Sequence, residues 1–294
     1  MNVIVALAMS WCVAALLVPV VPRLDRLFAP AVLVRVLSAG ALVLTVATTS
    51  SAVAAAACLL FVGGGAVGWM AAVLIVCLLA VSGVRAGRHG VRVRASMRAA
   101  GLFRDSALRD GDVLIVEDEV PDAFAVPGRR PVVVVTAGLR KSLPAAEFRA
   151  VVRHERAHLR ARHYVHVQLV ELAALLNPLL SGWPAAVRFA TERHADECAA
   201  AVDRPATARA LARAAMLCSG SHQQSALSIV GGRRDVVRRV QALRHPRPAR
   251  QRRWAVAVAV VVMLALLTNA VTTADLIQDR IAPEPREAPS VVVG

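Results

Sequence analysis

The chain has only five cysteines, and none of them belongs to a CxxC pair. This pattern excludes a disulfide framework of the kind that stabilises small secreted domains. Three cysteines fall in long apolar stretches, where a thiol behaves as a small apolar group, and two fall in a segment expected in a reducing compartment. They are Cys12, Cys58 and Cys77 in the first group, and Cys198 and Cys218 in the second.

Charged residues are absent from three long stretches, residues 2–21, 36–84 and 254–273. Together with 57% hydrophobic residues and a mean hydropathy of +0.56, this pattern is typical of an integral membrane protein. The second stretch is too long for one transmembrane helix and long enough for two, with a hairpin at glycines 63–65. We therefore predict four spans, at about 2–21, 36–61, 66–84 and 254–274.

The first apolar stretch could instead be a cleavable signal peptide. It has no basic residue before its apolar part and no small-residue cleavage site before Arg23. A retained first span is therefore predicted.

The net charge of +15 is carried almost entirely by arginine, since Lys141 is the only lysine. Arginines flank the first loop and follow the third span, and positive residues concentrate on the cytoplasmic side of membranes. This predicts an extracytoplasmic N-terminus, a cytoplasmic domain at residues 85–253 and a short extracytoplasmic tail at 275–294. We interpret the basic excess, including the run at 233–253, as anchoring to the lipid bilayer, and we expect no direct binding of nucleic acid. A docking surface for a repressor or for DNA is the alternative for that run.

Residues 154–158, HERAH, form the HExxH pattern of zinc metallopeptidases. In a helix, His154 and His158 lie one turn apart on one face and can bind the same Zn²⁺ ion. Glu155 projects from the adjoining face, where it can accept a proton from a water molecule that attacks a peptide carbonyl. The sequence therefore predicts His154 and His158 as metal ligands and Glu155 as the catalytic base.

The motif lies inside residues 144–177, a run that predicts a single helix because it starts with a proline and ends at an Asn-Pro pair. A catalytic zinc usually has three protein ligands. His163 is one residue too early for the third histidine of the metzincin pattern, and Glu171 would lie roughly 20 Å beyond His158 on one helix. The third ligand is therefore expected from another segment.

A second predicted helix, residues 187–202, contains the sequence ERHAD. Glu192 and Asp196 are four residues apart on one face, so Glu192 can bind the metal while Asp196 accepts the free N–H of a ligand imidazole. The pattern alone is also typical of a solvated acidic face, and only its combination with HExxH favours a ligand role. His194 is the substitute third ligand, and a ligand role for Cys198 is conceivable.

Short strands are predicted at residues 113–116, 123–126 and 131–136, separated by acidic or Pro/Gly turns. In a zincin, a strand beside the active-site helix binds an extended substrate through its backbone. The strands at 123–126 and 132–135 are the two candidates for this role. The unbroken valines at 132–135 favour a buried strand, so the substrate role is assigned to the strand at 123–126. Its residues are Ala123, Phe124, Ala125 and Val126.

The segment that follows the motif contains three side chains that could stabilise an oxyanion, those of His163, Tyr164 and His166. Residues at such places on a long helix are more often surface or packing positions. The oxyanion role is therefore left open.

HERAH at 154–158, the Asn-Pro pair at 177–178 and ERHADE at 192–197, in this order, resemble the BlaR/MecR-type antirepressor membrane peptidases. DAFAVPG at 122–128 and VVVVTAGL at 132–139 are similar to the same family and to the related HtpX-like peptidases. The resemblance spans residues 112–200 and the membrane layout. It implies a gluzincin that cleaves a cytoplasmic transcriptional repressor in a regulated way. The sensor members of that family continue into a large penicillin-binding domain, so without one we expect no beta-lactam sensing by this chain.

The prediction is an α+β integral membrane protein with about four transmembrane helices and a cytoplasmic, gluzincin-like zinc metallopeptidase domain. Its expected activity is hydrolysis of peptide bonds in a cytoplasmic protein. An HtpX-like quality-control protease of membrane proteins and a catalytically silent signalling protein are the alternatives.

Overall fold

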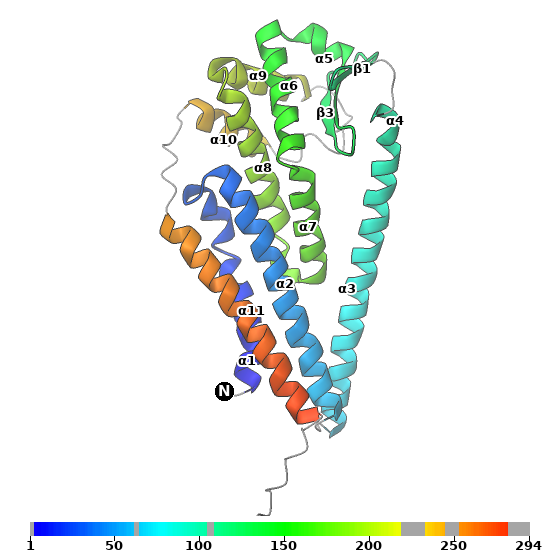
Figure 1. The fold of residues 1–294 in the computed structure, drawn as a ribbon, viewed down its shortest axis with the longest axis vertical. Helices are drawn as coiled ribbons and strands as arrows, with labels where there is room; N and C mark the ends of the chain where they lie inside the picture. Colours follow the sequence, from blue (N-terminus) through cyan, green and yellow to red (C-terminus); the bar gives the residue numbers. More distant parts are fainter. Residues whose placement is uncertain (1–2, 62–64, 105–108, 219–232, 245–252, 282–294) are drawn as a thin grey trace, which may run out of the picture.

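The computed structural model describes residues 3–61, 65–104, 109–218, 233–244 and 253–281. The chain is mostly helical with one small sheet, and Figure 1 shows an elongated molecule with the sheet at one end and long helices reaching the other. The centre of the predicted glycine hairpin, part of the arginine run before the last span and the end of the C-terminal tail lie outside the described residues.

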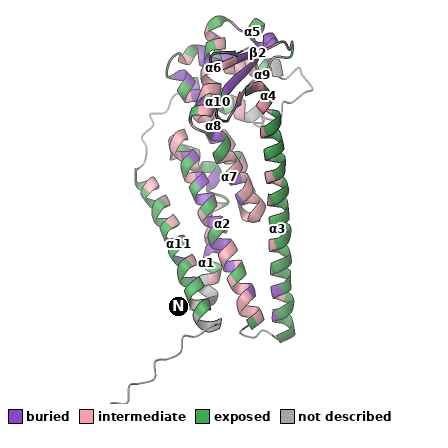
Figure 2. Cartoon of the chain, turned by 45° about the vertical axis from the view of Figure 1, so that its right-hand side comes forward, coloured by how far each residue is buried: buried purple, intermediate pink, exposed green. Residues whose placement is uncertain are grey.

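Within the described residues, three helices are long and apolar enough to cross a membrane. They are α2 (Pro30–Phe61), α3 (Gly65–Ala99) and α11 (Arg253–Ile281), at the second, third and fourth predicted spans. Only 11% of the most apolar part of α3 is buried, and Figure 2 shows its exposed surface along most of its length. The helix α1 (Val3–Leu17) is apolar but shorter, so the first predicted span stays a prediction.

The sheet has four strands in the order β1-β2-β4-β3. Their bounds are β1 (Arg109–Asp110), β2 (Val113–Val116), β3 (Ala123–Val126) and β4 (Val132–Thr136). Strand β4 runs parallel to β2 and antiparallel to β3, and all five of its residues are buried. The valine run is thus a central strand, and β3 lies at an edge of the sheet.

The chain leaves β4 through a tight turn that explains the pattern VVVVTAGL. The side chain of Thr136 accepts a hydrogen bond from the backbone N–H of Leu139 and caps α5 (Ala137–Ser142). Gly138 packs so closely that a Cβ atom there would lie 2.1 Å from the carbonyl oxygen of Glu119. Only glycine fits at this position without displacing the backbone.

The prediction of one helix over residues 144–177 is wrong. The helix α6 (Ala145–Arg160) ends at Arg160, Arg162 has the left-handed φ of 50°, and α7 (His163–Leu176) starts as a separate helix. The backbone N–H of Ala161 still bonds to Ala157 before the break. The kink turns His163 back toward the HExxH motif, which a continuous helix would not do.

The remaining helices connect the sheet to the long apolar helices. After the short helix η2 (Pro178–Leu180), α8 (Trp183–Ala200) packs against α2, α6 and α7, and α9 (Arg204–Cys218) and α10 (Arg233–Arg244) cover it. Two shorter helices are η1 (Val21–Arg26) and α4 (Gly101–Arg104). The fully buried Asn177 donates a hydrogen bond to Thr48 of α2, so the Asn-Pro break is tied to one of the long apolar helices. The helices α6 and α8, which carry the two motifs, are therefore held side by side.

Candidate active site

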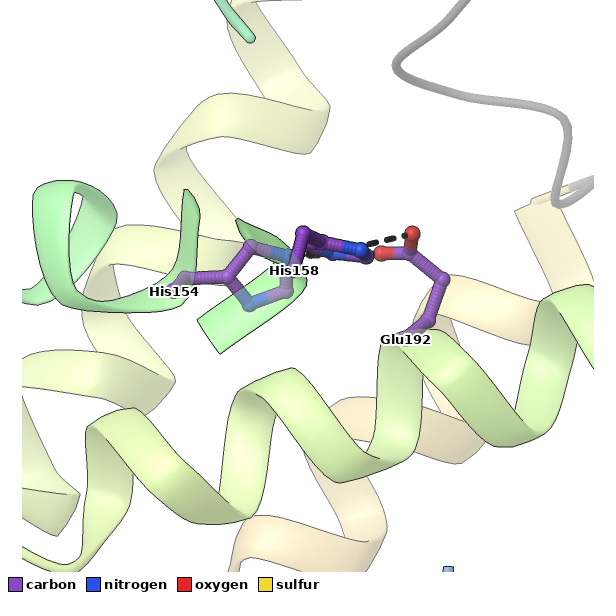
Figure 3. Close-up of side chains that lie close together, drawn as sticks. All are labelled: His154, His158 and Glu192. Atoms are coloured by element: carbon purple, nitrogen blue, oxygen red, sulfur yellow. Dashed lines mark hydrogen bonds and ion pairs between the residues drawn. The ribbon is translucent and has the colours of Figure 1, made fainter. Parts of the chain in front are cut away.

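The structure brings His154, His158 and Glu192 together at the contact of α6 with α8. One nitrogen or oxygen atom of each residue lies within 4.8 Å of the other two, and Figure 3 shows the three side chains pointing toward one another. The one-turn spacing of HExxH places both imidazoles on the face of α6 that meets α8. Each side chain is partly buried.

The geometry of these atoms fits a single tetrahedral metal ion. The Nε2 atoms of His154 and His158 are 3.1 Å apart, and each lies 3.5 Å from an oxygen of Glu192. Bonds of about 2.0–2.1 Å in a tetrahedral zinc site place the ligand atoms about 3.3 Å from one another. Two imidazoles and one carboxylate are also a usual donor set for catalytic zinc.

Asp196 lies behind His154. One oxygen of Asp196 is 3.1 Å from Nδ1 of His154, so the carboxylate can accept a hydrogen bond from Nδ1–H of that ring. In this tautomer the lone pair of Nε2 points toward the metal position. Asp196 is 1% exposed, and such a carboxylate requires compensation by a cation.

The compensating cation is Arg239 of α10, which the sequence analysis did not find. Its Nε and Nη2 atoms donate to both oxygens of Asp196 at 2.7 and 2.8 Å, and its Nη1 atom is 2.8 Å from Glu192. Arg239 belongs to the run that was interpreted as lipid-facing, yet it is only 9% exposed. That interpretation is wrong for this residue. Its guanidinium holds the pKa of Asp196 below the usual value, against the effect of burial.

A second set of hydrogen bonds starts at the other ligand, His158. Its Nδ1 atom is 3.0 Å from Nδ1 of His163, whose Nε2 atom is 2.9 Å from Nδ1 of His194. If Nε2 of His158 faces the metal with its lone pair, its Nδ1–H can donate to Nδ1 of a neutral His163, and the Nε2–H of His163 can donate to Nδ1 of a neutral His194. Burial lowers the pKa of His158 to about 4 and of His163 to about 2, so both are neutral near pH 7.

Glu155 occupies a cavity together with His154 and Glu192. Burial raises the pKa of Glu155 to about 7, partly countered by the charge of His154. A carboxyl group with a pKa near the working pH can both accept and return a proton.

Metal-free His154 is protonated at neutral pH. Burial lowers its pKa, but hydrogen bonds to Asp196 and Glu192 outweigh this effect and raise it to about 10. A metal ion must therefore displace a proton from His154.

The other candidates lie elsewhere. His194 contacts His163 and is not part of the metal cluster, Cys198 is exposed on α8, and Glu171 pairs with Arg188 and His89. Tyr164 is 39% exposed and His166 contacts Ser38 of α2. His163 lies behind His158, on the side away from the metal position. None of these side chains lines the cavity that contains Glu155.

The edge strand β3 starts at this cavity. Asp122 and Ala123 line it together with His154 and Glu155, and β3 packs against α6. The predicted substrate-binding residues 123–126 thus lie on an edge strand beside the motif helix. Phe124 has its ring 5.5 Å from that of Phe103, so that side chain packs on the far face of the sheet.

The family model of peptidase family M48 matches residues 97–259, more than half of the chain. The match contains HExxH, the Glu192 helix and Arg239. No curated protein and no solved structure gives a significant match. The matched segment and its metallopeptidase motifs show that this chain belongs to peptidase family M48.

Proposed function

We propose that the chain is a membrane-anchored zinc endopeptidase in which His154, His158 and Glu192 hold the ion and Glu155 is the general base. The observation that carries this proposal is the triangle of ligand atoms beside the partly buried Glu155 in the matched segment. Peptidases of family M48 are generally metal-dependent, which supports a hydrolytic role. When bound, the zinc ion would supply Lewis-acid polarisation of the scissile carbonyl and would acidify nearby water.

The side chains around the metal position have separate roles in the proposed reaction. Glu155 takes a proton from the attacking water and later delivers it to the leaving amine. Asp196 and His163 fix the ring orientations of His154 and His158, and Arg239 orients Asp196 and Glu192. The outer edge of β3, which pairs with no other strand among the described residues, can bind an extended substrate through backbone hydrogen bonds, which would align the peptide across the cavity.

The cellular part of the proposal rests on the arginine distribution and on the motif resemblance. Residues 85–253 are proposed to lie in the cytoplasm, where the substrate would be a protein, in the first place a transcriptional repressor. Cleavage of many membrane proteins for quality control is the competing function. Comparing the new terminal peptides of cells with and without the gene separates one cytoplasmic substrate from many membrane substrates.

The purified full chain in a neutral detergent tests the activity itself. After removal of metal with a chelator, the protein should not cleave an unfolded protein substrate, and addition of one equivalent of Zn²⁺ should restore cleavage. Full activity in the metal-free protein would contradict the proposal. A chain that binds no zinc and cleaves nothing would also contradict it and would favour a catalytically silent signalling protein.

A further inference from the structure

The active-site helix α6 carries a row of arginines on the side away from the metal. Arg149, Arg153, Arg156 and Arg160 are spaced at i, i+4, i+7 and i+11, so they share one face of the helix. At about 100° per residue, this face is opposite to the one that carries His154 and His158. The row has no part in the chemistry proposed above.

Three of these arginines line a groove of about 610 Å³ together with Arg140 of α5. This volume falls within the range of about 300–1,000 Å³ that is typical of ligand sites. The groove lies between α6 and β2, and its apolar lining is provided by Val113, Ile115, Phe148 and Val152. It therefore combines an apolar surface with guanidinium groups.

The positive charge of the groove is largely uncompensated within the described residues. Arg156 forms a bidentate pair with Asp112, at 2.7 and 2.6 Å, and Asp112 is the one acidic residue that lines the groove. Arg140 and Arg149 are exposed and have no carboxylate partner among the described residues. The Nε atom of Arg153 is buried and has no hydrogen-bond partner there, and a ligand oxygen would supply one.

The position of the groove distinguishes between classes of ligand. Figures 1 and 2 place α6 and the sheet at the end of the molecule opposite the lower ends of α2, α3 and α11, away from where a bilayer would surround them. An apolar surface between arginines also fits carboxylates interspersed with apolar side chains better than a continuous phosphate backbone.

We propose that this groove binds an acidic, partly apolar segment of polypeptide, namely a segment of the protein substrate outside the cleavage site. The inference rests on the proposed function for the identity of the ligand as a substrate. Binding itself is independent of cleavage, since the groove and the metal cluster lie on opposite sides of α6. The groove would select substrates by an acidic segment and hold them while the scissile bond enters the cavity on the other side.

The test uses the full chain in neutral detergent with the Glu155→Gln substitution, so that the probe is not cut. The probe is a short fluorescein-labelled peptide in which Glu and Leu alternate, and binding is followed by fluorescence anisotropy. The double variant Arg140→Glu/Arg149→Glu should bind about tenfold or more weakly, because two charge-assisted contacts are replaced by repulsion. Arg153→Ala, a separate variant, should also weaken binding. The matched control is Arg129→Glu/Arg130→Glu, which makes the same charge change at two exposed residues of the β3–β4 turn and should bind as the parent does.

Zinc content and thermal unfolding of each variant show that it is folded. Equal binding by the parent and both groove variants would overturn the proposal, and so would equal weakening by the control. Displacement of the peptide by inorganic phosphate at the same concentration would instead assign the groove to a simple anion. Displacement by phosphatidylglycerol vesicles, but not by phosphatidylcholine vesicles, would assign it to a membrane surface. If the parent chain binds the peptide but wild type proves to have no peptidase activity, the groove is still a binding site for acidic polypeptide. Only the proposed function is then contradicted.

Discussion

Removal of Arg239 should destabilise the metal-free protein far more than removal of its neighbour Arg238. Arg239→Met would leave the buried carboxylate of Asp196 and the partly buried carboxylate of Glu192 to share one imidazolium, that of His154. Breaking a buried ion pair by removing one partner costs about 3–5 kcal/mol. Arg238 is 47% exposed and pairs with Asp25, so its loss should cost about 0–1 kcal/mol.

At the usual entropy of unfolding per residue, these free energies correspond to a decrease in Tm of about 5–8 °C for Arg239→Met and of at most about 2 °C for Arg238→Met. Thermal unfolding in detergent with a chelator present measures both. Addition of Asp196→Asn to Arg239→Met should recover part of the loss, because it removes the charge that Arg239 compensates. Equal and small decreases in Tm for the two arginine variants would refute the assignment of Arg239 to the centre of the site.

Three further results are expected. Glu192→Ala should lower the zinc content per chain, whereas Glu171→Ala, on α7 and paired with Arg188, should leave it unchanged. Metal analysis of both purified proteins decides this. The same zinc content in Glu192→Ala as in wild type would mean that another residue is the third ligand. Zinc binding at pH 7 should release about one proton, because the pKa of metal-free His154 is about 10, and the apparent affinity should fall about tenfold for each pH unit below that value. Calorimetry in buffers of different ionisation enthalpy measures that proton, and a heat independent of the buffer would contradict it. Reporter fusions after Arg98 and after Gly294 should lie on opposite sides of the membrane, and reporters on one side would contradict the predicted topology.

Local patterns predicted the parts of the structure that depend on local physics. The strands at 113–116 and 123–126 have the predicted bounds, since β-branched and aromatic residues there are enclosed by turn residues. The four-residue spacings His154–His158 and Glu192–Asp196 fix which side chains share a helix face, whatever the rest of the fold does. The pairing of the two helices followed from the chemistry, because one metal ion needs ligands from both.

The break at Arg162 could not be predicted in this way. Neither Ala161 nor Arg162 is a glycine or a proline, and arginine favours helices, so no local signal marks the left-handed residue. Its role in bringing His163 to His158 becomes visible only with α7 packed against α2 and α8.

Arg239 was missed for a different reason. Arg238 and Arg239 are adjacent in a sequence full of arginines, and only the packing of α10 on α8 and α9 buries one and exposes the other. The apolar residues Val236 and Leu243, three before and four after Arg239, are signals in the sequence that could have indicated the buried face.

The central claim is that Glu155 is the catalytic base and not a metal ligand or a structural residue. Glu155→Gln keeps the size and the hydrogen bonding of the side chain but removes the proton acceptor. Measured on a proven substrate alongside zinc content, this variant should bind zinc as wild type does and should cleave about 10²–10⁴-fold more slowly. Cleavage at the wild-type rate by zinc-loaded Glu155→Gln would contradict the account.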